Sequence, residues 1–129
     1  MPLPRKMIAI VDDNTQLRTG VERYLQAAGF KCATFESAEA FLAVAASLGA
    51  ACLLADVHLE AMSGLELAVH PTVTELKLPV VIMTGSVDPL IELSARNISV
   101  AFLRKPFGCS ALLEAIVGTV GPPIAEGYN

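Results

Sequence analysis

The sequence lacks the features of a membrane protein and of a nucleic-acid-binding protein. No apolar stretch among its 129 residues approaches the roughly 20 residues that a membrane-spanning helix needs. Basic residues are also scarce: 9 lysines and arginines stand against 13 aspartates and glutamates, which leaves a formal net charge of −4. Direct binding of nucleic acid requires a basic surface, and this composition does not supply one. We therefore expect a protein partner, with no nucleic acid and no membrane.

Cysteine and tryptophan are scarce as well. The three cysteines, Cys32, Cys52 and Cys109, are odd in number and have no CxxC spacing, which argues against disulfides and against a zinc site. We expect buried free thiols in a reducing cytoplasm. Tryptophan is absent, so a fluorescence titration would be a poor probe of this protein.

Apolar residues, in contrast, are abundant. They make up 53% of the chain and charged residues only 17%, which is not the composition of a disordered protein. The length suits one domain with a single core. We expect that domain over residues 1–121. Residues 122–129 are expected to form a flexible tail or the start of a linker, because Gly121, Pro122 and Pro123 stop the last helix.

Apolar runs of strand length alternate with segments in which apolar residues recur at helical spacing. The runs are typical of strands buried on both faces and lie at residues 7–11, 30–34, 52–55, 80–83 and 100–103. Helices are predicted over residues 15–28, 37–48, 64–70, 88–96 and 107–120. Asn14 is the expected cap of the first helix, and Gly29 closes it.

The later helix boundaries depend on single residues. Pro71 should end or kink the third helix near His70. Asp88 followed by Pro89 favours the start of the fourth helix, and Asn97 can end it in the left-handed conformation. Strand and helix alternate five times, which predicts a flavodoxin-like, doubly wound α/β domain. Its parallel sheet would have the order 2-1-3-4-5, with helices on both faces.

Polar residues follow four of the apolar runs, at the point where each predicted strand ends. Asp12 and Asp13 follow the first run, Asp56 the third, Thr84 the fourth and Lys105 the fifth. In an open α/β sheet, reactive groups lie just outside the carboxyl ends of the strands. We therefore expect these five side chains to converge on one site.

The three carboxylates of that site predict a divalent cation. Carboxylates about 4 Å apart repel each other by about 4 kcal/mol per pair at an effective dielectric constant of about 20. Oxygen ligands with room for water suit Mg²⁺, or Mn²⁺ in its place. The expected ligands are Asp12, Asp13, Asp56 and the backbone carbonyl of His58. Lys105 would add a compact positive charge and Thr84 a hydroxyl donor, so that Asp56 becomes a nucleophile for in-line phosphoryl transfer.

Together with their neighbours, these residues resemble the receiver (CheY-like) domain of bacterial two-component response regulators. The motifs that carry the resemblance are Asp12-Asp13, Asp56, Met62-Ser63-Gly64, Thr84-Gly85 and Lys105-Pro106-Phe107. They cover the chain from residue 7 to about residue 120. The stretches at residues 63–67 and 103–107 also resemble receivers that precede LuxR-type DNA-binding regulators.

The resemblance implies that Asp56 accepts a phosphoryl group from the phosphohistidine of a sensor histidine kinase, in a Mg²⁺-dependent reaction. It implies that Thr84 and Phe102 form a switch pair: Thr84 moves to the phosphoryl group and the aromatic ring follows inward. It also implies a cis peptide bond between Lys105 and Pro106. Such a domain is regulatory rather than an enzyme, with only slow self-catalysed phosphotransfer and dephosphorylation.

The partners that the resemblance implies are proteins. They are the kinase, a downstream protein or an output domain outside this chain, and a second copy bound through the fourth helix, fifth strand and fifth helix.

Four departures from the family pattern affect this interaction surface more than they affect the phosphorylation residues. Glu60 stands where a proline is usual, and Pro71 shortens the third helix. The spacing from Thr84 to Lys105 is one residue short, and the usual glycine before the fifth strand is absent.

Some residues have two readings. His58 is either a solvent-exposed loop residue or, with Ser86, a group that tunes the attack of water on phosphorylated Asp56. Phe102 is either the switch aromatic or plain core.

Three other functions are alternatives to the phosphoacceptor switch. A degenerate receiver would serve only as a scaffold, but the complete residue set argues against it. An aspartyl-phosphate hydrolase of the haloacid dehalogenase type needs a second acid where His58 stands. A flavodoxin-like FMN carrier needs a Ser/Thr/Gly-rich loop after the first strand, where this chain has Asp12 and Asp13.

Overall fold

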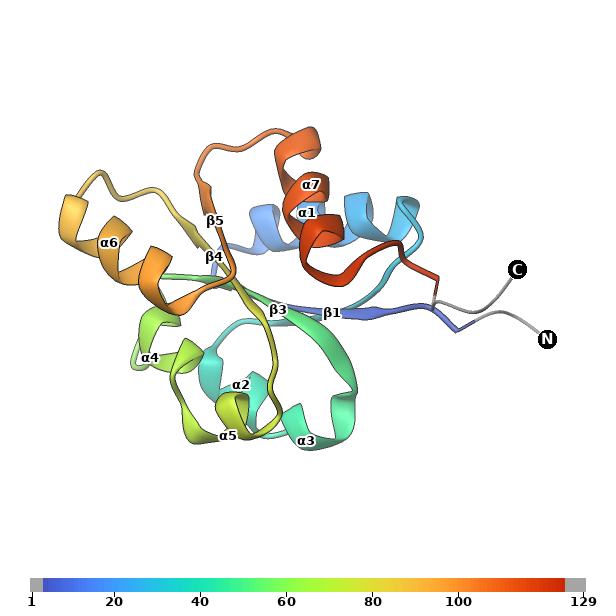
Figure 1. Ribbon diagram of the computed structural model, residues 1–129, viewed down its shortest axis with the longest axis horizontal. Helices are drawn as coiled ribbons and strands as arrows, with labels where there is room; N and C mark the ends of the chain where they lie inside the picture. Colours follow the sequence, from blue (N-terminus) through green and yellow to red (C-terminus); the bar gives the residue numbers. More distant parts are fainter. Residues whose placement is uncertain (1–3, 125–129) are drawn as a thin grey trace.

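The computed structural model describes residues 4–124 and contains one sheet of five parallel strands (Figure 1). The strand order is β2-β1-β3-β4-β5, so the predicted doubly wound sheet is confirmed. The strands are β1 (Met7–Val11), β2 (Lys31–Phe35), β3 (Ala50–Asp56), β4 (Val80–Thr84) and β5 (Ala101–Arg104). Each lies within two residues of its predicted bounds.

Alternate side chains of each central strand enter two separate cores, one on each face of the sheet. In β1, Ile8 and Ile10 pack into one core, while Ala9 and Val11 pack into the other. The same alternation continues along β3 and β4. Because both faces are buried, these strands are continuous apolar runs rather than alternating polar and apolar sequences.

Two long helices cover one face of the sheet, and five shorter helices cover the other (Figure 1). The long ones are α1 (Thr15–Ala27) and α7 (Cys109–Val120), which bury Leu25 and Ile116 against the sheet. The shorter ones are α2 (Ala38–Leu42), α3 (Ala45–Leu48), α4 (Gly64–Ala68), α5 (Pro71–Glu75) and α6 (Pro89–Ile98).

Several helices begin at side chains that accept backbone N–H groups. The Asn14 side chain accepts the N–H three residues on at 3.1 Å, and the Asp88 carboxylate accepts the N–H two residues on at 2.9 Å. Ser63 and Glu66 form a reciprocal capping box at the start of α4. The predicted starts of the first and fourth helices, α1 and α6, are thereby confirmed.

Three predicted helix boundaries are wrong. The helix expected over residues 37–48 is split into α2 and α3 at Val44, a β-branched residue with φ −123° and ψ 1°. Asn97 lies inside α6 instead of ending it, because the extended residue Ser99 terminates this helix. The last helix begins at Cys109 rather than at residue 107, because Gly108 before it has an extended conformation.

Pro71 both ends one helix and begins another. The helix α4 stops at Ala68, in agreement with the expectation that the chain leaves the helical conformation near His70. Proline lacks an N–H, which costs nothing in the first turn of a helix, and Pro71 is the first residue of α5. The Nδ1 atom of His70 accepts the Thr72 N–H at 3.1 Å and caps this short helix.

The two ends of the described chain lie side by side near the amino end of β1 (Figure 1). Arg5 and Ile124 form an antiparallel bridge, and the Lys6 N–H donates to the Pro123 carbonyl at 2.8 Å. The Lys6 ammonium group also donates to the Val120 carbonyl at the end of α7. Residues 123 and 124, which were expected in a flexible tail, are therefore held by backbone pairing. The rest of that tail, residues 125–129, lies outside the described residues, and the domain boundary stays a prediction.

The three cysteines are unpaired, but they differ in exposure. Cys52 is buried and Cys32 half-buried, whereas Cys109 is exposed at the start of α7, contrary to the expectation of buried thiols. Its position in the first turn of a surface helix explains the difference. Within residues 4–124, no helix is long and apolar enough to cross a membrane.

Candidate functional site

The carboxyl ends of four strands meet at one edge of the sheet. Asp12 follows β1 directly and Asp56 is the last residue of β3, and these two strands pair in register up to that level. Thr84 is the last residue of β4. The N–H of Lys105, which follows β5, donates to the Thr84 carbonyl at 2.7 Å. The structure thus brings together the strand ends that the sequence singled out.

Three carboxylates cluster at this edge. One oxygen atom from each of Asp12, Asp13 and Asp56 lies within 4.8 Å of the other two. Asp12 is fully buried and Asp56 is 5% exposed, while Asp13 faces solvent. Backbone donors fix the buried pair, because Asp12 Oδ1 accepts the Asn14 N–H at 2.9 Å and Asp56 Oδ1 accepts the His58 N–H at 3.2 Å.

Lys105 is the cation of the cluster. Its Nζ atom lies 2.9 Å from Asp12 Oδ2 and 3.2 Å from Asp56 Oδ2, so it bridges the two buried carboxylates. The peptide bond between Lys105 and Pro106 is cis, as expected. One ammonium group thus pairs with two of the three clustered carboxylates, so these four side chains together keep an excess of negative charge.

The protonation of the cluster reflects this excess. Burial raises the pKa of the Asp56 carboxyl, and the neighbouring charge of Asp12 raises it further, although Lys105 opposes both. Burial disfavours the charge of Lys105, but its hydrogen bond to Asp12 and the charge of Asp56 outweigh burial, and the pKa of Lys105 is raised. Lys105 therefore stays protonated, whereas the charged form of Asp56 is disfavoured relative to an aspartate in water.

The donor set fits a hard divalent cation. All three side-chain donors are carboxylate oxygens, which Mg²⁺ prefers, and one of them, Asp13, opens to solvent so that water ligands have access. Next to Asp13 lies a hollow of about 430 Å³, lined by Asp13, Glu36, Ser37, Glu39, Glu60 and Ala61. The fourth expected ligand, the His58 carbonyl, stays a prediction.

The surroundings of Gly64 explain why the loop after Asp56 needs a glycine at this position. A Cβ atom at this position would overlap the backbone carbonyl of Asp56. The Gly64 N–H donates to the Val57 carbonyl at 3.1 Å, which closes the loop against the end of β3. The motif at residues 62–64 thus holds the backbone that carries Asp56, and this contact is a geometric reason for a residue that the sequence marked only by resemblance.

The remaining predicted residues lie around Thr84. Thr84 is fully buried, and its Oγ1 atom accepts the Ser86 N–H at 3.0 Å. Phe102 is half-buried against the core that includes α6, so both readings of this ring fit its position. His58 is exposed, and Ser86 turns its Oγ atom toward α6, where it accepts the Asp88 N–H at 3.1 Å. Their roles stay predictions.

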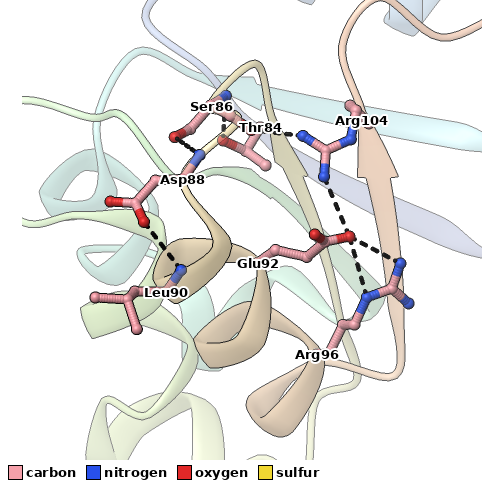
Figure 2. Close-up of polar contacts among 7 residues, drawn as sticks. All are labelled: Thr84, Ser86, Asp88, Leu90, Glu92, Arg96 and Arg104. Carbon is pink, nitrogen blue, oxygen red and sulfur yellow. Dashed lines mark hydrogen bonds and ion pairs between the residues drawn. The ribbon is translucent and has the colours of Figure 1, made fainter.

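Sequence reasoning missed two groups next to the site. The Arg18 Nη1 atom donates to the Asp12 backbone carbonyl at 2.6 Å. The second group is the Arg104 side chain (Figure 2). Its Nη1 atom donates to the Ser86 carbonyl at 2.6 Å, and its Nη2 atom lies 3.1 Å from the Glu92 carboxylate. Glu92 also pairs with Arg96 at 3.1 Å. Only the spacing of four residues between Glu92 and Arg96 could have been read from the sequence.

Comparison with known proteins agrees with this geometry. Residues 8–117 match the family described as the response regulator receiver domain. The transcriptional regulatory protein FixJ of Bradyrhizobium diazoefficiens is 30% identical over 119 residues, which are 89% of this chain and 58% of FixJ. The DNA-binding transcriptional regulator NtrC of Salmonella typhimurium is 36% identical over 106 residues, which are 81% of this chain and 23% of NtrC. The chain thus spans less than two thirds of the length of either relative.

Solved structures lead to the same family. The crystal structure of FixJ-N has a TM-score of 0.80 and 32% identity, covering 93% of this chain and 97% of that one. The chemotaxis protein CheY4 of Vibrio cholerae has a TM-score of 0.81 at 23% identity, covering 89% and 98% of the two chains, which supports the fold alone. The sheet order, the residues at the strand ends and these similarities together show that this chain belongs to the receiver domain family of two-component response regulators.

Proposed function

We propose that Asp56 is the phosphorylation site of this receiver domain, and that its phosphoryl donor is the phosphohistidine of a sensor histidine kinase. The observation that carries the proposal is the position of Asp56 at the end of β3, in contact with Lys105 and beside two further carboxylates. A carboxylate oxygen of Asp56 would attack phosphorus while the P–N bond breaks, and the leaving imidazole takes up a proton.

Asp12, Asp13, Asp56 and the His58 carbonyl would hold a Mg²⁺ or Mn²⁺ ion in this proposal. The bound ion would neutralise the charge of the transferring phosphoryl group. Lys105 already reaches two of these carboxylates, so it is placed to bind a phosphoryl oxygen without leaving its own strand end. The domain is regulatory, and we propose that it catalyses only its own slow phosphotransfer and dephosphorylation.

The proposed switch pair is Thr84 and Phe102. The buried hydroxyl of Thr84 would move to the new phosphoryl group, and the half-buried ring of Phe102 would follow inward. The two-state element would comprise the loop after Thr84, α6 and the surface around β5.

His58 and Ser86 are proposed to modulate the lifetime of the phosphorylated state. The exposed His58 lies two residues after Asp56, where its ring can overhang the site and affect the attack of water. The substitution His58→Ala should then change the dephosphorylation rate measured after removal of the donor. An unchanged rate would indicate that His58 is only a solvent-exposed loop residue.

The proposed partners are proteins. The names of FixJ and NtrC describe transcriptional regulators that are longer than this chain, which supports a role in which residues 1–121 control an output domain or a downstream protein. A second copy could bind through α6, β5 and α7. Exposed apolar side chains on these helices support that surface: Leu90 is 72% exposed, Leu93 58% and Val117 37%. Unpaired cysteines support a reducing, cytoplasmic location.

Intact mass after incubation with acetyl phosphate tests the proposal. The wild type should gain one phosphoryl group in the presence of Mg²⁺ and none in EDTA, and Asp56→Asn should gain none. The matched control is Asp88→Asn, which removes an exposed carboxylate at the start of α6 and should leave the adduct intact. Failure of the wild type to form any adduct would favour the scaffold reading, and an adduct on Asp56→Asn would place the site elsewhere.

A further inference from the structure

Arg104, the last residue of β5, joins three elements around the loop that follows Thr84 (Figure 2). One nitrogen of its guanidinium group donates to the Ser86 carbonyl at 2.6 Å. Another lies 3.1 Å from Glu92 of α6. The guanidinium carbon also lies 5.5 Å from the centre of the Phe102 ring. A single side chain thus ties the loop to α6 and to the proposed switch aromatic.

Ser86 is the point at which this arrangement reaches the site. Its N–H donates to Thr84 Oγ1 at 3.0 Å, while its carbonyl accepts from Arg104 (Figure 2). The hydroxyl of Thr84 and the guanidinium of Arg104 are therefore held by opposite ends of the same residue. A shift of Thr84 toward Asp56 must either break the bond to the Ser86 N–H or carry Ser86 away from Arg104.

The bond to the Ser86 carbonyl is charge-assisted, and planar guanidinium groups can bind two acceptors at once. Glu92 limits the freedom of Arg104 to follow the loop, because the carboxylate is fixed on α6 and also binds Arg96 at 3.1 Å. The short distance and the second anchor make Arg104 a restraint on the loop.

We propose that Arg104 is a positioning residue that holds the loop after Thr84 in the arrangement described here and thereby slows phosphorylation of Asp56. This inference rests on the proposed function. The rate of phosphorylation by a small donor depends on the fraction of molecules that have already reached the competent arrangement. A bond that stabilises the other arrangement of the loop lowers this fraction, so its removal accelerates the reaction.

Arg96 provides a matched control within the same cluster. Its guanidinium carbon lies 5.0 Å from the centre of the Phe102 ring, and it pairs with the same Glu92 oxygen. Arg96 differs in one respect, because it makes no hydrogen bond to the Ser86 carbonyl in the described structure. Arg96→Gln and Arg104→Gln therefore remove the same charge, ion pair and aromatic contact, and only the second frees the loop.

The test compares the rates at which acetyl phosphate and Mg²⁺ phosphorylate the wild type, Arg104→Gln and Arg96→Gln, followed by intact mass. We expect Arg104→Gln to react about fivefold faster than the wild type, which corresponds to about 1 kcal/mol at 1.4 kcal/mol per factor of ten. Arg96→Gln should stay within about twofold of the wild type. Loss of a positive charge by itself would slow the reaction with an anionic donor, so the sign of the effect separates release of the loop from electrostatics.

Amide hydrogen exchange of the unphosphorylated proteins gives a second measurement. The Ser86 N–H should exchange about fivefold faster in Arg104→Gln than in the wild type and Arg96→Gln, because Ser86 lies on the freed loop and its N–H bond to Thr84 Oγ1 opens more often. Equal or slower phosphorylation of Arg104→Gln, with an adduct on Asp56 in both proteins, would overturn the role of Arg104 alone. Faster phosphorylation without faster exchange would also overturn it. No adduct on the wild type would refute the proposed function, and this role with it.

Discussion

Replacing Asp56 by asparagine should stabilise the fold when divalent ions are absent. One oxygen of each of the three carboxylates lies within 4.8 Å of the others, and at an effective dielectric constant of about 20 this distance corresponds to about 3.5 kcal/mol of repulsion per pair. Two such repulsions act on Asp56, about 7 kcal/mol in all, and the ammonium group of Lys105 at 3.2 Å returns about 5 kcal/mol. The balance opposes the charge on Asp56 by about 2 kcal/mol.

Screening by solvent reduces this net repulsion on the Asp56 carboxylate. Asp13 is exposed and the Lys105 side chain is 22% exposed, so water screens part of both interactions. We expect Asp56→Asn to raise the free energy of unfolding by about 1 kcal/mol, or the Tm by about 4 °C. Asparagine is nearly isosteric and keeps an oxygen that can accept the His58 N–H, so the packing should survive the change.

The assay is thermal unfolding followed by circular dichroism, in EDTA and in Mg²⁺. Mg²⁺ should raise the Tm of the wild type by binding the folded state, and the rise should be smaller for Asp56→Asn. Asp88→Asn, which alters an exposed carboxylate, should change the unfolding free energy by less than about 0.5 kcal/mol. A variant Asp56→Asn that is less stable than the wild type in EDTA would refute the reasoning.

The same prediction has a pH dependence. Burial and the charge of Asp12 raise the pKa of Asp56 above the usual 3.8 of an aspartate. The folded wild type therefore binds this proton more tightly than the unfolded chain, and its stability falls as the pH rises through the folded-state pKa. In EDTA, the advantage of Asp56→Asn should be largest at neutral pH and should vanish as the pH falls below that pKa.

Three further predictions concern other parts of the fold. Burial raises the pKa of the Cys52 thiol to about 12, so a maleimide at neutral pH should label exposed Cys109 first and Cys52 only on unfolding; equal labelling rates would contradict the burial described here. Gly20→Ala in α1 should raise the unfolding free energy in urea by about 1 kcal/mol, whereas Gly49→Ala, at φ 70°, should lower it by about 1 kcal/mol; neither Cβ meets a neighbour, so like signs would refute the conformational argument. Ser63→Ala removes the cap of α4 and should cost about 1 kcal/mol in the same assay, with no loss expected if the capping box is absent.

The sequence predicts the sheet, and the convergence of the residues at its strand ends, because both follow from local pattern. Each central strand is an uninterrupted apolar run, and the polar residue that ends it marks the carboxyl edge of the sheet. Once the strand order is known, Asp12, Asp56, Thr84 and Lys105 must lie near one another. The proximity of these four residues can therefore be predicted from the strand order alone, without knowledge of any tertiary contact.

The sequence predicts less of the structure where contacts between distant segments determine it. Arg104 lies 18 residues from Ser86 along the chain, and nothing in either segment indicates that they bond. The break at Val44 and the continuation of α6 through Asn97 to an extended Ser99 have no capping signal in the sequence that marks them. Local propensity is a weak guide where tertiary packing overrides it.

The pairing of Arg5 with Ile124 determines how far from the acidic cluster a neighbouring module would be attached. Both ends of the described chain are tied to the amino end of β1, whereas the acidic cluster lies at its carboxyl end. With 5 residues at about 3.3 Å each, β1 separates the two by roughly 16 Å. A module joined at residue 124 would therefore be attached at the end of β1 opposite to the acidic cluster, without direct contact with Asp56. A change at Asp56 would reach such a module through the intervening body of the domain rather than through the point of attachment.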